Sequence, residues 1–274
     1  MVRTLSAIIR SSHPGPTLAV TTLSLLLALA FNLPAGNAAW IVIAVLLNQV
    51  AVGVSNDVVD VARDRRAGRK DKPIAAGEIT LATARWAVVI AGTLSLGLSA
   101  WVHPIVGLWQ AVFLASGLAY NFGLKATVFS ALTYATGFGS LPILVSMGAE
   151  PAAWPPLWVV VVGASLGVSA HFANVLPDGD TDRLEGVRGL PQRLSRPVAA
   201  AVIVVLTVLS SVMLITGGGS GALITTVLAG IIASSIAIWA GLLALWPGST
   251  IWPFRLSMLA ALVLALGLVG AISG

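Results

Sequence analysis

The segment Ser55–Arg66, SNDVVDVARDRR, follows directly on an apolar run over residues 39–54. It places three aspartates, Asp57, Asp60 and Asp64, on adjacent turns at the end of one hydrophobic helix. Negative charges at a helix C-terminus oppose the helix dipole, and carboxylates on neighbouring turns repel each other. A chain retains such residues when something cationic compensates them. The segment therefore predicts a site that holds positive charge.

The composition of the 274-residue chain places this segment in a membrane protein. The chain is 57% hydrophobic and only 9% charged, whereas a soluble domain carries about 25% charged residues. Its mean hydropathy is +0.97. The absence of cysteine excludes a disulfide framework, a thiol nucleophile and cysteine-ligated metals. The net charge of +5 is too small, given where the charges lie, to indicate nucleic-acid binding.

Apolar segments long enough to cross a bilayer, at about 20 residues each, recur along the chain. They cover residues 17–33, 39–56, 82–102, 104–123, 126–147, 156–176, 197–216, 222–246 and 251–272. Turn-forming residues separate them, and no change in composition marks a second domain. We therefore expect an all-α integral membrane protein with nine transmembrane helices and a single domain over residues 1–274.

The charges predict how these segments are oriented. If the N-terminus is cytoplasmic, all 15 Lys and Arg residues fall on cytoplasmic connections, as the positive-inside rule requires. A missed or an extra span would move the later basic clusters to the outer side. Nine of the ten acids also lie on the cytoplasmic side, and only Glu150 lies outside. The rule places no demand on acids, so their gathering after the second and sixth spans needs another cause.

An internal repeat supplies that cause. Residues 56–73 read N-x3-D-x3-D-R-x2-G-x-K-x2-P, and residues 174–191 read N-x3-D-x3-D-R-x2-G-x-R-x2-P, with an offset of 118 and no gap. Steps of four residues keep to one helix face, so each Asn and its two Asp form a stripe over roughly 12 Å. Two such helices facing each other would enclose a central cavity walled by carboxylates and rimmed by Arg and Lys.

Such a cavity has a predictable ligand. Facing carboxylates repel unless a divalent cation joins them, and oxygen ligands favour Mg²⁺. Magnesium commonly completes its shell with substrate phosphate oxygens, and nearby basic residues would neutralise the remaining phosphate charge. Because the site lies in a membrane, the expected ligand is a diphosphate with a lipid tail, such as a polyprenyl diphosphate.

The motifs resemble those of the UbiA superfamily of intramembrane prenyltransferases, which has nine transmembrane helices and Asp-rich motifs after helices 2 and 6. The first motif, NDxxDxxxD, is complete over Asn56–Asp64, and a basic-Pro-Ile-x-x-Gly pattern follows at Lys72–Gly77. The second motif contains Asp178 and Asp182, followed by Gly186 and Leu190-Pro191. The resemblance extends from about Arg10 to Pro191. Arg10 and His13 precede the first span, where relatives often have a basic residue, although an interface anchor explains them equally well.

The resemblance implies Mg²⁺-dependent prenyl transfer through ionisation of an allylic diphosphate. It implies metal ligation by Asp60, Asp64, Asp178 and Asp182. The residues expected to stabilise the leaving diphosphate are Lys125, Arg69, Lys70, Lys72 and Arg188. Asn56 and Asn174 are expected to orient a carboxylate or contact the substrate. Asp57 is expected to steer an aromatic acceptor or to take its proton.

Two positions depart from the family pattern. Many relatives carry a further acid at the start of the second motif, where this chain has Val175. The YxxxK motif after helix 4 is also altered, because Tyr120 stands five residues before Lys125 and Asn121 stands four before it. Either Tyr120 or Asn121 could therefore face the site.

These residues suggest three functional classes. The first is a prenyltransferase with a hydroxybenzoate-like or quinone-precursor acceptor, and the second is a terpene cyclase that quenches the same cation internally. The third is a transporter, which would place acids near the bilayer midplane rather than at one face. The sequence favours the prenyltransferase. Arginine outnumbers lysine 12 to 3, and alanine is abundant, which suggests a GC-rich bacterial genome. The expected location is therefore a bacterial plasma membrane, where membrane lipid surrounds the protein. Acceptor, prenyl length and oligomeric state are left open by the sequence.

Overall fold

The computed structural model describes residues 2–176, 186–219, 222–246 and 251–273, and this part of the chain is helical without strands. The helices are α1 Val2–Ser11, α2 Pro14–Ala30, α3 Ala35–Arg66, α4 Leu81–Val102, α5 Pro104–Asn121, α6 Ser130–Ser146, α7 Leu157–Val175, α9 Leu190–Arg193, α10 Arg196–Gly217, α11 Leu223–Leu245 and α12 Trp252–Ser273, with a short 3₁₀ turn, η1, at Leu124–Ala126. Asp178 and Asp182 lie outside the described residues.

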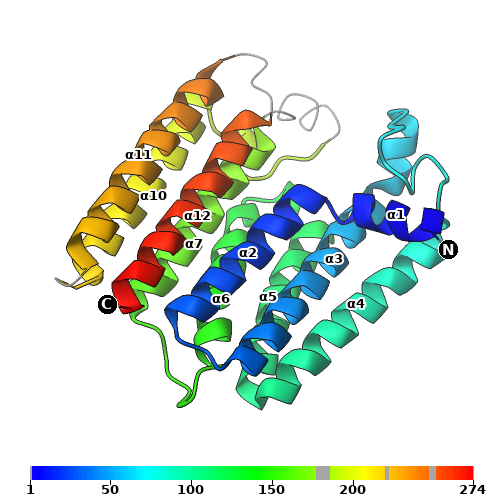
Figure 1. Ribbon diagram of the computed structural model, residues 1–274. Helices are drawn as coiled ribbons and strands as arrows, with labels where there is room; N and C mark the ends of the chain where they lie inside the picture. The colour runs from blue at the N-terminus through cyan, green and yellow to red at the C-terminus, as the bar shows by residue number, and fades with distance from the viewer. Residues whose placement is uncertain (1, 177–185, 220–221, 247–250, 274) are drawn as a thin grey trace.

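The long helices stand side by side in a bundle (Figure 1). Sequence neighbours pack against each other, as in the pairs α3–α4, α6–α7, α10–α11 and α11–α12. In addition, α12 packs on α2, so the last helix closes against the first long one. The helices α2, α3, α5, α6, α7 and α12 thereby surround the interior, while α4 and α11 contribute no residue to the cavity described below.

Many of these helices have the properties of membrane spans. In the described residues, six helices are long and apolar enough to cross a bilayer, namely α3, α4, α7, α10, α11 and α12. The bent pair of α1 and α2 would make a seventh. Each apolar segment predicted from the sequence overlaps one long helix. Large apolar side chains on the outer surface, such as Ile224, Trp239 and Leu266, are suited to contact with lipid tails.

Helix α3 extends beyond the predicted membrane span of residues 39–56. It continues to Arg66, so the first Asp motif forms its last turns, and the three aspartates lie on one helix as expected from the sequence. No Gly or Pro interrupts residues 54–66. The helix ends at Gly68, whose φ of 67° is easily adopted only by glycine. There the Gly68 and Arg69 amides donate to the carbonyls of Arg65 and Asp64 at 3.2 and 3.0 Å, a Schellman cap.

The bend between α1 and α2 fits tightly against α3. The two helices meet at 72°, and His13 at the corner has a left-handed backbone with φ 56°. A Cβ atom on Gly53 of α3 would lie 2.4 Å from the Ser12 carbonyl oxygen, so only glycine allows this approach. An ion pair between Arg10 and Glu78 also ties α1 to the segment after α3. The corner is therefore fixed over the Asp motif.

We expect Gly53→Ala to loosen this corner. The added methyl group would meet backbone rather than a movable side chain, and overpacking of this kind costs about 1–3 kcal/mol. Thermal unfolding in detergent should show a lower midpoint than for the wild-type protein. Gly97→Ala in α4 is the matched control, because nothing lies within 4 Å of its added Cβ, and alanine is the better helix former. Equal midpoints for the two variants would contradict the tight contact.

Candidate active site

A cavity of about 590 Å³ runs through the middle of the bundle. At one end it is lined by charged side chains: Asp60, Arg63, Asp64, Arg69, Asp71, Lys72 and Lys125. At the other end its walls are apolar and include Leu27, Leu214 and Leu268. On α7 its lining extends from Asn174 to Trp158, sixteen residues and thus about 24 Å along the helix axis. The cavity therefore joins a charged mouth to a long apolar body.

Asp60 is held by two cationic side chains. Its Oδ1 accepts a hydrogen bond from Lys125 Nζ at 2.5 Å, and its Oδ2 accepts one from Arg63 Nη2 at 3.0 Å. Lys125 comes from η1, so this contact joins the end of α5 to the Asp motif of α3. Asp60 and Lys125 are both largely shielded from solvent. Lys125 and Arg63 thus balance the negative charge of Asp60, and Lys125 still lines the cavity.

Asp64 differs from Asp60. Its side chain is buried and lines the cavity, yet within the described ranges no residue donates a hydrogen bond to it. Buried carboxylates are costly unless they are paired or bind a cation. The Asp64 carboxylate thus has no hydrogen-bond donor among the described residues.

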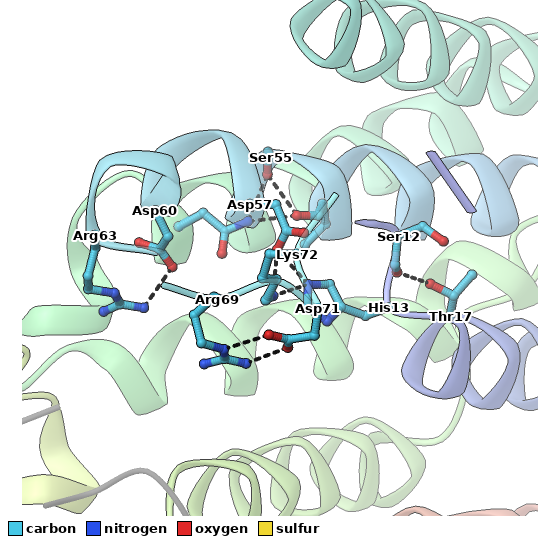
Figure 2. Close-up of polar contacts among 12 residues, drawn as sticks. Ser12, His13, Thr17, Ser55, Asp57, Asp60, Arg63, Arg69, Asp71 and Lys72 are labelled. Carbon is cyan, nitrogen blue, oxygen red and sulfur yellow. Dashed lines mark hydrogen bonds and ion pairs between the residues drawn. The ribbon is translucent and has the colours of Figure 1, made fainter. Parts of the chain in front are cut away.

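Asp57, about one turn before Asp60 on α3, lies in a compact network with His13 and Lys72 (Figure 2). Asp57 Oδ1 is 2.6 Å from Lys72 Nζ and 3.0 Å from His13 Nε2, and Lys72 Nζ is 3.3 Å from the same imidazole nitrogen. The Asp57 side chain is 1% exposed, whereas that of His13 is 36% exposed. His13 and Lys72 line the cavity, and buried Asp57 stands behind them.

Arg69 and Asp71 form an exposed bidentate pair at the mouth of the cavity. Arg69 Nε and Nη2 donate to the two carboxylate oxygens at 3.0 and 2.8 Å (Figure 2). The hydrogen bond from Arg69 lowers the pKa of Asp71 from 3.8 to about 2. A lowered pKa means that the pair weakens only as the pH falls from 3.8 towards 2, so it is intact at neutral pH.

The wall opposite α3 is aromatic. The ring of Tyr134 lies 5.1 Å from that of Tyr120, edge to face, and 4.5 Å from that of His171, nearly stacked. Phe138 stacks on the other side of Tyr134 at 6.1 Å. Tyr120, Tyr134 and Phe138 line the cavity, and such faces accommodate rings and cations.

The structure also distinguishes Tyr120 from Asn121. Both line the cavity, but the Asn121 amide donates to the Val52 carbonyl at 2.8 Å and to Ser55 Oγ at 2.7 Å. Asn121 thus binds α5 to α3 with its donors, whereas Tyr120 presents a ring to the interior.

The predicted site residues separate into four groups, one of which is Asp57 alone, buried and not lining the cavity. Those that line the cavity are Asn56, Asp60, Asp64, Arg69, Lys72, Tyr120, Asn121, Lys125 and Asn174. Lys70 and Arg188 are exposed and do not line it in the described structure. The last group, Asp178 and Asp182, lies outside the described residues. The two repeats share one conformational feature, because Gly68 and Gly186 both have positive φ, 67° and 82°.

Several residues of the cavity were not predicted from the sequence. Gln49 lies seven residues before Asn56, so the helical period of the stripe could have identified it. Asn48 and Tyr134 lie within apolar segments, whose pattern indicates only helix packing. No spacing rule links His13 to Asp57, because they meet only through the bend between α1 and α2.

A divalent metal fits the donors at the charged end. Within the described ranges, no group of three or more His, Cys, Asp or Glu side chains could hold a metal by itself. The buried carboxylate of Asp64, which accepts no hydrogen bond from the described residues, nevertheless supplies hard oxygen ligands at the cavity wall. The remaining ligands would have to come from Asp60 and from outside the described ranges.

Sequence comparison identifies the family. The UbiA prenyltransferase family model matches residues 17–263. The chain belongs to the UbiA prenyltransferase family. UbiA family members are prenyltransferases, so this chain is an enzyme of that class. Among curated proteins, none matches it in sequence.

Solved structures show the same fold at low sequence identity. A UbiA homologue from Aeropyrum pernix K1, solved in the apo state, matches with a TM-score of 0.75 and 18% identity, over 92% of this chain and 96% of that one. A UbiA homologue from Archaeoglobus fulgidus bound to GPP and Mg²⁺ matches with a TM-score of 0.68 and 16% identity, over 98% and 100%. A structure described for digeranylgeranylglyceryl phosphate synthase matches with a TM-score of 0.69 and 18% identity, over 99% of both chains.

Proposed function

We propose that this UbiA-family enzyme transfers a prenyl group from a polyprenyl diphosphate to an aromatic, hydroxybenzoate-like or quinone-precursor acceptor within the membrane, in a Mg²⁺-dependent reaction. The observation that carries the proposal is the continuity of the charged mouth with the apolar body of the cavity. A diphosphate suits the mouth, and a hydrocarbon tail suits the body. The Archaeoglobus homologue bound to GPP and Mg²⁺ supports the choice of ligand.

Asp60 and Asp64, with Asp178 and Asp182, would hold Mg²⁺. When bound, the metal supplies charge stabilisation for the diphosphate leaving group. The burial of Asp64 at the cavity wall, without a hydrogen-bond donor among the described residues, supports this role on α3. Asn174 lines the cavity from α7, at the N-terminal end of the second motif, which supports a contribution from that side. Val175 is buried and lines the cavity beside Asn174, where many relatives carry an acid.

The cationic side chains would bind the diphosphate. Lys125, Arg69 and Lys72 line the mouth, and Lys70 and Arg188 would contribute from its rim. As the bond between the prenyl C1 and the diphosphate oxygen breaks, its electron pair goes to the oxygen, and these cations stabilise that charge. Asn56 and Asn174 would orient the diphosphate or a neighbouring carboxylate. The apolar walls exclude water from the allylic cation until the acceptor attacks.

An aromatic acceptor is supported by the wall of rings. Tyr120, Tyr134 and Phe138 face the cavity and offer surfaces on which an aromatic ring can stack. The electron-rich acceptor ring would attack the cation and then lose one proton. Asp57 would assist the loss of this proton. Because it is buried behind His13 and Lys72, it would act through those two side chains.

The membrane topology follows from the same charges. Nine crossings with a cytoplasmic N-terminus would place the mouth of the cavity, with its basic residues, on the cytoplasmic side of a bacterial plasma membrane. Arg10, Lys72 and Lys125 all lie towards that end, whereas Glu150 bonds with Asn37, at the start of α3.

The proposal is tested by incubating the purified protein with Mg²⁺, geranyl diphosphate and 4-hydroxybenzoate, and then with longer prenyl diphosphates. Mass spectrometry should detect a prenylated aromatic product, and chelation of Mg²⁺ should abolish it. A cyclic hydrocarbon formed from the diphosphate alone would instead identify a terpene cyclase. No diphosphate release with any prenyl length, from a folded sample, would refute both reactions.

A further inference from the structure

The network at the α1–α2 corner fixes the tautomer of His13. Asp57 is buried and salt-bridged to Lys72, so it is ionised and its oxygens only accept hydrogen bonds. The Nε2 atom of His13, 3.0 Å from Asp57 Oδ1, is therefore assigned as a donor to this oxygen, which Lys72 Nζ, 3.3 Å from Nε2, also approaches at 2.6 Å. In the neutral ring of this tautomer the lone pair is on Nδ1, and in the described structure nothing donates to that atom.

His13 lines the cavity, whereas Asp57 does not. The His13 side chain is 36% exposed and lines the cavity, whereas the Asp57 side chain is 1% exposed behind it. A carboxylate that holds one imidazole nitrogen orients the ring and stabilises the imidazolium formed when the other nitrogen takes a proton. Asp57 can thus act on a substrate only through His13 or Lys72.

We propose that His13 is a catalytic residue that takes the proton lost by the acceptor, and that Asp57 and Lys72 are positioning residues for it. This inference rests on the proposed prenyl transfer and names its base. The hydroxyl proton of a phenolic acceptor moves to Nδ1 of His13 while the ring π electrons form the bond to the prenyl C1. The resulting ketone regains aromaticity by moving its ring hydrogen to the oxygen. The imidazolium later gives its proton to water or to the released diphosphate, so one proton is lost for each transfer.

Two amides next to this corner give the acceptor a second anchor. Gly53 contacts the Ser12 backbone, and Gln49 and Asn48 lie four and five residues before it on α3, about 6 to 8 Å further from the charged end along the helix axis. Asn48 is fully buried, and its Nδ2 has no hydrogen-bond partner in the described structure. A buried donor without a partner at a cavity wall is suited to an oxygen of the ligand. An acceptor with its hydroxyl at His13 would place an oxygen-bearing substituent here.

The experiment uses two variants of His13 chosen for its left-handed backbone. Asparagine and glycine both tolerate a φ of 56°, so His13→Asn and His13→Gly remove the imidazole without strain. Both should lower kcat for prenylation of 4-hydroxybenzoate by about 10²–10⁴-fold. The slow release of diphosphate without acceptor should fall far less than prenyl transfer does. Added imidazole should restore transfer by His13→Gly, whose space is open, and not by His13→Asn.

Three controls separate this role from the alternatives. His103→Asn, at an exposed helix start far along the chain, should retain wild-type activity because asparagine is a good N-cap. Asn48→Ala should raise the KM for 4-hydroxybenzoate and leave kcat nearly unchanged. Asp57→Asn should lower kcat without a response to imidazole.

The outcomes distinguish the two proposals. Equal loss of diphosphate release and of transfer in both His13 variants, without rescue, would overturn the catalytic role of His13. If the wild-type protein releases no diphosphate at all, the proposed function fails instead. In that case ¹⁵N-histidine NMR still decides the inference: a neutral His13 with its proton on Nε2, whose Nδ1 resonance shifts when 4-hydroxybenzoate binds, supports it. The opposite tautomer, or no shift at saturating ligand, overturns it.

Discussion

Asp64→Asn is expected to lower prenyl transfer at least about 100-fold while leaving the protein as stable as the wild type. Loss of groups that merely support a metal ligand already costs about 10–100-fold, so loss of a ligand should cost more. The amide has the same shape as the carboxylate, and in the described structure the Asp64 carboxylate accepts no hydrogen bond that the change would break. Removing a buried charge that accepts no hydrogen bond from the described residues should even raise stability slightly. Steady-state rates over a range of Mg²⁺ concentrations and thermal unfolding provide the two measurements.

Glu150→Gln is the matched control for Asp64→Asn. It makes the same chemical change at the opposite end of the bundle, where Glu150 accepts a hydrogen bond from Asn37. Its activity should equal that of the wild type. If Asp64→Asn retained more than half of the wild-type rate, Asp64 would not be a metal ligand. If its loss of activity came with a large fall in the unfolding midpoint, the effect would be structural.

Lys125→Met should also have a large effect, lowering kcat by about 10²–10³-fold because it removes a cation from the leaving diphosphate. The side chain keeps its length and apolar stem. It leaves Asp60 with Arg63 as its remaining described donor, so some stability should be lost as well. Adding Asp60→Asn to Lys125→Met removes the carboxylate charge that has lost one of its two cationic partners, and we expect this double variant to regain stability but not activity.

Arg85→Met is the comparison for Lys125→Met. Arg85 is exposed on α4, a helix that contributes no residue to the cavity in the described structure. The same loss of one positive charge should therefore leave the rate unchanged. If Lys125→Met lost no more activity than Arg85→Met, Lys125 would not stabilise the leaving diphosphate.

Much of the fold could be predicted from the sequence. Long apolar segments must become helices in a membrane because every backbone group needs an internal partner there. The helical period likewise places Asn56, Asp60 and Asp64 on one face, and the structure finds all three at the cavity wall. The glycine of the first repeat was likewise expected to mark a turn after this stripe, and α3 ends just before Gly68, where the backbone adopts a positive φ.

Contacts between distant segments could not be predicted in the same way. The pairing of Asp60 with Lys125 and that of Asp57 with His13 and Lys72 join residues far apart in the sequence. They depend on the bend between α1 and α2, on the 3₁₀ turn at Lys125 and on the close approach that Gly53 permits. No local pattern encodes these distances.

The sequence by itself determined that this protein is a helical membrane enzyme with an acidic stripe, because hydropathy and helical period are properties of short segments. Only the tertiary structure decided what each aspartate does. It paired Asp60 with Lys125, left Asp64 without a partner among the described residues, and buried Asp57 behind His13. The physical reason is that a carboxylate's role depends on the charges and donors within a few ångströms of it, and packing between distant helices sets those neighbours.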